Sequence, residues 1–239
     1  MTTATEPDAY QGEAQPLVEH LREFRTRFII ALLAVFVTTL LVMPFTDAAL
    51  QILISPLENK PQALNPTDAL VQWFKVAMVG GISLAIPIIL YQIIAFLLPA
   101  LTRREKRYIF FFLPAATLFF LGGILFGAMV ALPVSLSFLQ NFGEEFAVIQ
   151  WTLEAYVSFV TTLLLALGIG FQTPLVIFFL AKLGIVSYQT LIKNVRWAFL
   201  ASAILSAVLT PTPDPWTMVV VMIPLFLLYL LGVLFARFA

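Results

Sequence analysis

The chain alternates between long apolar runs and short polar segments, and this pattern predicts helices that cross a membrane. A membrane-crossing helix needs about 20 mainly apolar residues. Six runs fit or approach that length: 26–44, 71–97, 108–131, 153–181, 195–210 and 217–235. We therefore predict an all-α integral membrane protein with six transmembrane helices, formed by residues 16–238 as one membrane domain and preceded by a disordered cytoplasmic tail over residues 1–15.

The fifth and sixth predicted spans are short. The fifth, residues 195–210, reaches about 24 Å at about 1.5 Å per residue, less than a hydrocarbon core of about 30 Å. We expect the bilayer to thin beside these spans, or partner helices to pack there.

Between the first two spans, apolar residues recur with helical spacing at positions 50, 53, 54 and 57. This spacing predicts a helix lying along the outer membrane surface. We expect the segment 137–151 to do the same. We expect the two segments to form a cap over one end of the helix bundle.

Composition supports the membrane interpretation and removes several functions. Of the 239 residues, 61% are hydrophobic and 11% are charged, against about a half and a quarter in soluble domains. The net charge is zero, so there is no basic surface for nucleic acid. With no cysteine and a single histidine, His20, neither a thiolate nor a histidine cluster is available. We expect no metal site, no cofactor and no enzymatic activity.

The basic residues predict the orientation of the chain. Eleven of the 13 Lys and Arg residues lie in segments on the side of the N-terminus, and only Lys60 and Lys75 belong to the other side. Short loops rich in Lys and Arg stay in the cytoplasm. We therefore expect both termini to be cytoplasmic. The acidic first 15 residues lack the pattern of a cleaved signal.

Glu23 is an acid at a boundary where bases normally anchor a helix. It lies about 7.5 Å before Phe28 at helical rise, just outside the predicted lipid region. One interpretation is an ion pair with Arg27 on the next turn, worth about 0.2–0.5 kcal/mol. The other is an acceptor for a cationic guest at the membrane surface.

Glu105 is the second candidate acid. With Thr102 it fits a capping box at the start of the third span. It also lies among four basic residues that would keep its carboxylate charged. Capping and guest binding are compatible, because a carboxylate has about four lone-pair sites.

Gln172 is the conspicuous polar residue at membrane depth. Pro174 leaves the carbonyl of Gly170 without its helical donor, and Gln172 or Thr173 could satisfy it. Alternatively, Gln172 forms a hydrogen bond to a partner span. Asp214 is most simply a turn residue or the cap of the last span.

Several motifs resemble a known family. The stretch "HLREFRTR" is similar to an N-terminal signature "HLxELRxR", with Phe24 in place of Leu. "IPIILYQIIAFLLPALTRREKR" is similar to the family's second span and first inner loop. "ISPL" at 54–57 and "TPTPDP" at 210–215 also fit. The family is TatC, the core subunit of the twin-arginine protein translocase, and the resemblance covers residues 16–238.

The resemblance implies a cupped six-span fold and a receptor for twin-arginine signal peptides of folded cargo proteins. It implies single-span TatA and TatB partners in the lipid bilayer, with TatB along the fifth span, and self-association. The host membrane would be the cell inner membrane, or the thylakoid in an organelle. The implied signal-peptide site is Glu23, Arg25, Phe96, Pro99, Leu101 and Glu105. The implied partner contacts are Gln172, Pro174 and Asp214, and the implied structural prolines are Pro56 and Pro87.

Two positions depart from the family pattern. Gln172 stands where Glu is frequent, which removes a titratable charge but keeps a hydrogen-bonding group. Met218 stands where a polar residue is common. A small-molecule permease is the alternative function from another class; it requires a polar path through the membrane, for which Gln172 and scattered Ser and Thr are the available groups.

Overall fold

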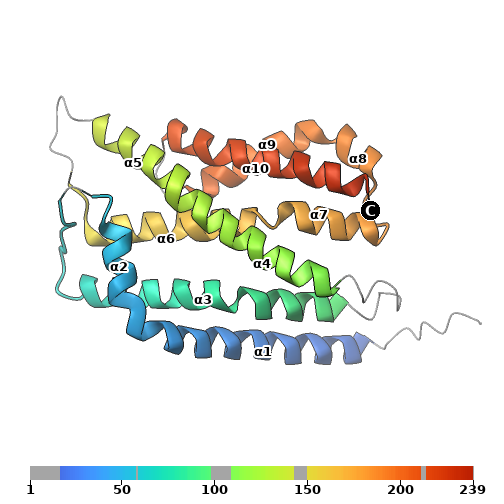
Figure 1. Ribbon diagram of the computed structural model, residues 1–239, viewed down its shortest axis with the longest axis horizontal. Helices are drawn as coiled ribbons and strands as arrows, with labels where there is room; N and C mark the ends of the chain where they lie inside the picture. Colours follow the sequence, from blue (N-terminus) through green and yellow to red (C-terminus); the bar gives the residue numbers. More distant parts are fainter. Residues whose placement is uncertain (1–16, 58, 98–108, 143–149, 211–213, 239) are drawn as a thin grey trace, which may run out of the picture.

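The computed structural model describes residues 17–57, 59–97, 109–142, 150–210 and 214–238. Within those ranges the regular structure is helical, and the β-pairing present is a single bridge between Gln62 and Thr152. The long helices lie along one axis, with α4 crossing the bundle diagonally (Figure 1). The predicted all-α fold class is confirmed.

The first two long helices form an antiparallel pair (Figure 1). Helix α1 spans Leu17–Val42 and packs along α3, which spans Asp68–Leu97. Glycine lets the two backbones approach closely, and the Thr38 hydroxyl donates to the Gly81 carbonyl at 2.7 Å. Most large apolar side chains on the remaining surface of α1 are exposed, as expected for a helix that faces lipid.

A short turn, η1 at Met43–Phe45, contains Pro44 and follows α1 directly, and α2 at Thr46–Ile54 then crosses the end of the bundle. The following loop joins the start of α6: Gln62 N donates to Trp151 O at 2.9 Å, and Leu153 N donates to Gln62 O at 2.8 Å. The Tyr156 hydroxyl donates to Leu53 O at 2.6 Å. These contacts make a cap, and we call this the capped end of the molecule.

The third helical segment continues beyond its predicted end at residue 131. It comprises α4 at Ile109–Phe126, a π-helical turn at Gly127–Ala131, and α5 at Leu132–Asn141. Pro133 lies two residues after that predicted end. It occupies the first turn of α5, where a backbone N–H is not required, and the π turn before it absorbs the change in register.

The fourth predicted span is two helices. Helix α6 spans Leu153–Gly170 and α7 spans Thr173–Lys182. The break falls at Phe171 and Gln172, and Pro174 is the second residue of α7. Helix α6 forms much of the core, with Tyr156, Phe159 and Leu163 almost completely buried.

The last third of the chain contains α8 at Tyr188–Lys193, α9 at Val195–Leu209 and α10 at Pro215–Ala236. Helix α9 has 15 residues and is short for a membrane span, as predicted. Helix α10 has 22 residues, so the expectation that the sixth span is short does not hold. The difference arises because Asp214 caps α10 before the predicted start, so the helix begins at Pro215 instead of residue 217 and continues to Ala236.

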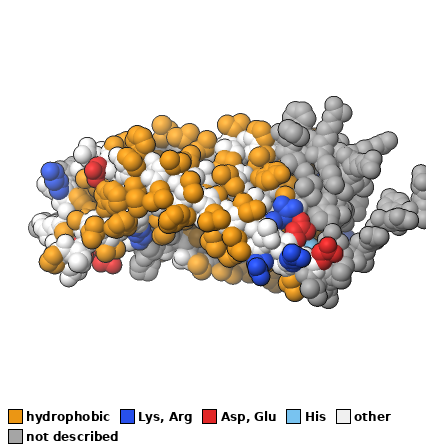
Figure 2. Space-filling view, turned by 90° about the horizontal axis from the view of Figure 1, so that it is seen from below, with side chains coloured by type: hydrophobic (Ala, Val, Ile, Leu, Met, Phe, Trp, Pro, Cys, Tyr) orange, Lys and Arg blue, Asp and Glu red, His pale blue; other side chains and the backbone are white. Residues whose placement is uncertain are grey.

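In the part of the chain that the structure describes, five helical segments are long and apolar enough to cross a membrane, and α9 is a shorter apolar helix. In the view of Figure 2, hydrophobic side chains cover the middle of the molecule and charged side chains gather toward its two ends. This distribution is typical of a protein that spans a bilayer.

Candidate functional site at the N-terminal end of the helix pair

The site lies where α1 begins and α3 ends, at the opposite end of the bundle from the cap (Figure 1). Glu23 and Arg27 form an ion pair there, one helical turn apart. Arg27 Nη2 donates to Glu23 Oε1 at 2.6 Å and Arg27 Nε donates to the same oxygen at 2.9 Å. The local pairing expected from the sequence is therefore present.

Both arginine donors use a single carboxylate oxygen. Within the described residues, Glu23 Oε2 accepts no hydrogen bond. The side chains of Glu23 and Arg27 are 24% and 26% exposed, so the free oxygen is on an accessible group. Glu23 is thus both held in place and able to accept another donor.

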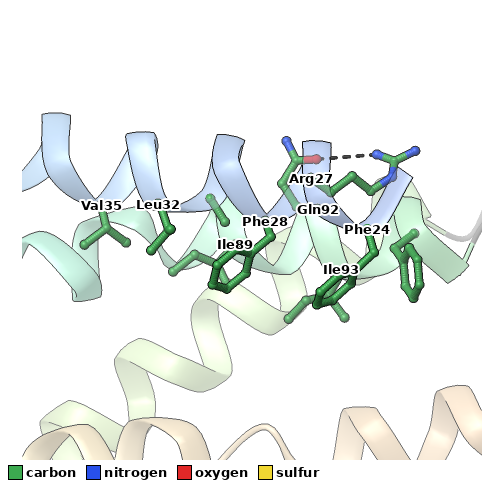
Figure 3. Close-up of a pocket in the computed structure, with 10 residues that line it drawn as sticks. Phe24, Arg27, Phe28, Leu32, Val35, Ile89, Gln92 and Ile93 are labelled. Atoms are coloured by element: carbon green, nitrogen blue, oxygen red, sulfur yellow. Dashed lines mark hydrogen bonds between the residues drawn. The ribbon is translucent and has the colours of Figure 1, made fainter. Parts of the chain in front are cut away.

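Arg27 also connects the two helices. Its Nη1 donates to Gln92 Oε1 on α3 at 3.4 Å (Figure 3). Held from both sides, Arg27 fixes the direction of the Glu23 carboxylate. Sequence reasoning missed Gln92, although an amide in the apolar run 86–98 was a visible signal.

Aromatic rings pack together at the same end of the helix pair as Glu23. The Phe96 ring lies 4.3 Å from the His20 ring in a stacked arrangement and 5.6 Å from the Phe24 ring edge-on. Phe24 in turn lies 5.9 Å from Phe28. Aromatic faces attract guanidinium groups within about 6 Å of the ring centre. The site therefore combines a carboxylate with rings suited to an arginine side chain.

An apolar groove of about 450 Å³ starts at these rings and runs between α1 and α3. Arg27 and Gln92 lie at its polar end, and the apolar side chains that line it point to one side of the helix pair (Figure 3). Those side chains are Phe24, Phe28, Ala31, Leu32, Val35, Ile89, Ile93 and Phe96.

The other predicted signal-site residues divide into two groups. Arg25 is exposed and has no ion-pair partner among the described residues. Pro99, Leu101 and Glu105 lie outside the described residues. Of the two prolines predicted to be structural, Pro56 is in the turn after α2 and Pro87 is inside α3.

The structure places Gln172 and Pro174 inside the chain. Pro174 is almost completely buried. Gln172 is 9% exposed, and its Nε2 donates to the Ala116 carbonyl on α4 at 2.8 Å. Its interhelical hydrogen bond therefore joins two helices of this chain. Asp214 caps α10, because its Oδ1 accepts from Thr217 N at 2.6 Å.

Replacing Gln172 with Leu should destabilise the chain modestly, by about 1 kcal/mol, because an interhelical hydrogen bond in a membrane is worth about 0.6–2 kcal/mol. Thermal unfolding in detergent would measure this, with Gln189→Leu on the exposed surface of α8 as the control. An unfolding midpoint equal to that of the parent chain would show that the Ala116 contact contributes nothing.

The fold and this site define a multi-pass helical membrane protein with an acidic, ring-lined site at one end of its bundle. A family model described as "Sec-independent protein translocase protein (TatC)" matches residues 19–224. The chain belongs to the TatC family, as its motifs indicated.

Similar proteins with known names support this family membership. The chain is 35% identical to a Sec-independent protein translocase protein TatC of Carboxydothermus hydrogenoformans, covering 95% of both chains. It is 33% identical to the TatC of Deinococcus radiodurans over 98% of this chain and 90% of that one. It is also similar to a solved crystal structure of the twin-arginine translocase receptor TatC, with a TM-score of 0.82 and 32% identity, covering 92% of this chain and 98% of that one.

Proposed function

We propose that this chain is the twin-arginine signal-peptide receptor and scaffold subunit of a translocase that exports folded proteins. The observation that carries the proposal is the Glu23 carboxylate, whose Oε1 is held by Arg27 and whose Oε2 accepts no hydrogen bond from the described residues. The rings of His20, Phe24 and Phe96 pack together at the same end of the helix pair. Family membership supports the same function, and the described residues provide no support for a permease.

The chemistry of arginine explains why such a site would read a pair of arginines. A guanidinium presents a planar fork of donors that matches carboxylate oxygens and stacks on aromatic rings, whereas a lysine ammonium offers neither geometry. Glu23 would accept one arginine and Glu105 the other. The neighbouring basic residues would repel cationic peptides that do not pair with the carboxylates.

The groove between α1 and α3 gives the signal peptide a second contact. Its polar end lies at Arg27, one turn from Glu23, and its apolar wall continues to Val35. An apolar stretch that follows the arginines could lie along this wall while the folded cargo stays in the cytoplasm. This arrangement requires the N-terminal end of the bundle to face the cytoplasm, as the Lys and Arg distribution predicts.

A ring-for-ring photocrosslinker tests the receptor proposal. Benzoylphenylalanine at position 24 replaces one ring beside Glu23 by another. We expect an adduct with a signal peptide that carries two arginines. When both arginines are replaced by lysines, the adduct yield should fall by at least about tenfold, because each charged hydrogen bond is worth about 1.5–3 kcal/mol. Equal yields for the two peptides would contradict the proposal.

We further propose that single-span TatA and TatB subunits pack against α9, and that copies of the chain associate within the complex. A second groove, of about 390 Å³, lies between α6, α9 and α10. On α9 it is lined by Leu205, Leu209 and three small residues, Ala198, Ala201 and Ser202, which let another helix approach closely. Asp214 lies in the connection between α9 and α10, where it caps α10. Gln172 would act on this surface indirectly, by holding α7 to α4.

Filling this groove should release the partner. Ala201→Leu is expected to reduce co-purification of the single-span subunits several-fold, because the added side chain occupies the space that the partner helix needs. Ala207→Leu adds the same side chain at another exposed position of α9 and is the control. Equal co-purification of both variants with the parent chain would show that this groove is not the partner site.

A further inference from the structure

Lys75 is a cationic side chain placed inside a predicted membrane span. It lies seven residues after Asp68, the first residue of α3, which is about 10 Å along the helix. Its half-buried ammonium donates to the Ser158 hydroxyl on α6 at 2.7 Å. A charged group at membrane depth is costly and usually has a charged partner or a function. Within the described residues, Lys75 has the neutral Ser158 as its partner and no acid.

Among the described residues, the acids near Lys75 at the capped end do not pair with it. Asp47 accepts from the Trp73 indole at 2.8 Å, and Asp68 accepts from the backbone of Leu64 and Asn65. Glu154 lies one turn before Ser158 on α6, exposed and near the helix start, where the helix dipole stabilises a negative charge. Lys75 bonds to Ser158 and not to Glu154.

A second polar group accompanies Lys75. Thr162 is one turn after Ser158 on the same face of α6, and it is exposed. Its hydroxyl makes no hydrogen bond in the described part of the chain, whereas neighbouring Thr161 donates to the Val157 carbonyl. Lys75, Ser158 and Thr162 thus offer an ammonium and two hydroxyl donors, a set suited to an anionic acceptor.

The surface around these donors is apolar and open. Val71 and Met78 lie on the same face of α3 as Lys75, one turn to either side, and are 54% and 51% exposed. A transmembrane helix could pack on this surface and place a side chain at the donors.

Depth favours a carboxylate on a helix over a lipid phosphate. Thr162 is nine residues after Leu153, about 13 Å along α6, which approaches the middle of a core about 30 Å thick. A phosphate stays at the headgroup level, whereas a helix can carry a carboxylate to any depth. We infer that Lys75, Ser158 and Thr162 form a docking site for an Asp or Glu in the transmembrane helix of a partner subunit, in the half of the membrane nearer the capped end.

A photocrosslinker at Met78 tests this inference in membranes that contain the full chain and its co-expressed single-span subunits. We expect an adduct with a subunit whose span carries an acid in the half nearer the capped end. Lys75→Gln should lower the adduct yield at least fivefold, and Thr162→Val about twofold. Combining Lys75→Glu with replacement of the partner's acid by Lys should restore the yield.

Three controls make the result specific. Lys60→Gln removes an exposed lysine of the outer loop and should change nothing, and Glu154→Gln should also leave the yield unchanged. The signal-peptide adduct at position 24 should persist in every variant. Loss of the adduct at Met78 therefore tests the docking site, and loss of the adduct at position 24 tests the receptor function. If the Lys75→Gln variant also loses the signal-peptide adduct at position 24, that variant has not folded. The Thr162→Val variant and the charge-reversed pair then test the docking site.

The inference is overturned by any of four results: a yield unaffected by Lys75→Gln in a folded chain, an adduct with a helix that lacks an acid in that half, adducts with lipid alone, or a loss in Glu154→Gln equal to that in Lys75→Gln. The last would identify Glu154 as the partner of Lys75 in the membrane.

Discussion

Replacing Glu23 and Glu105 together with alanine is expected to lower the affinity for a twin-arginine signal peptide by at least 100-fold and to stop export of folded cargo. Each carboxylate would provide charged hydrogen bonds to one guanidinium, worth about 1.5–3 kcal/mol each, so each single variant should lose about tenfold or more. Binding of a labelled signal peptide to the purified complex measures the affinity directly.

The control for this experiment is Glu19→Ala. Glu19 lies one turn before Glu23 on the same helix, is exposed, and has no ion-pair partner in the described part of the chain. This variant removes a negative charge near the site without changing Glu23 or Glu105. It therefore shows whether general negative charge is sufficient to bind the signal peptide. The fold should tolerate Glu23→Ala, because an exposed pair such as Glu23–Arg27 contributes about 0.2–1 kcal/mol. Normal affinity in the double variant would remove the receptor function from these residues.

Gly123→Ala is expected to destabilise the chain by about 2–3 kcal/mol, through overpacking where α4 crosses α6. A Cβ at position 123 would lie 2.6 Å from the Leu167 carbonyl oxygen and 2.8 Å from Gly168 Cα. These are backbone atoms, so no side-chain rotation can relieve the clash and the helices must separate. Thermal unfolding in detergent would show the loss.

The adjacent glycine provides a matched control. A Cβ at Gly122 would meet a single neighbour, the Phe171 ring at 4.0 Å, which is an ordinary contact. Gly122→Ala should therefore leave the unfolding midpoint near that of the parent chain. Similar midpoints for the two variants would mean that the close approach of α4 and α6 does not limit stability.

The sequence was sufficient for features that depend on neighbouring residues. Apolar runs of membrane length predicted the helical class, and the four-residue spacing of Glu23 and Arg27 predicted their ion pair. The cap formed by Asp214 was also readable, because a capping side chain bonds to the backbone three residues away.

Features that depend on distant residues could not be read in the same way. Gln172 was recognised as a polar group needing a partner, but its acceptor, Ala116, is 56 residues away. The link from Arg27 to Gln92 spans 65 residues and depends on how α1 and α3 pack. The third span was predicted to end at residue 131 for a different reason: the π turn at Gly127–Ala131, through which the helical segment continues, has no marker in the apolar pattern.

The packing of α1 on α3 has a consequence for how the protein is made. The two helices are separated in the chain by η1 and α2 alone, and the hydrogen bonds from Thr38 to Gly81 and from Arg27 to Gln92 lie within the first 92 residues. Proteins begin to fold from the N-terminus during synthesis. We expect this hairpin, with Glu23 already oriented, to assemble in the bilayer while the ribosome is still translating the remaining helices.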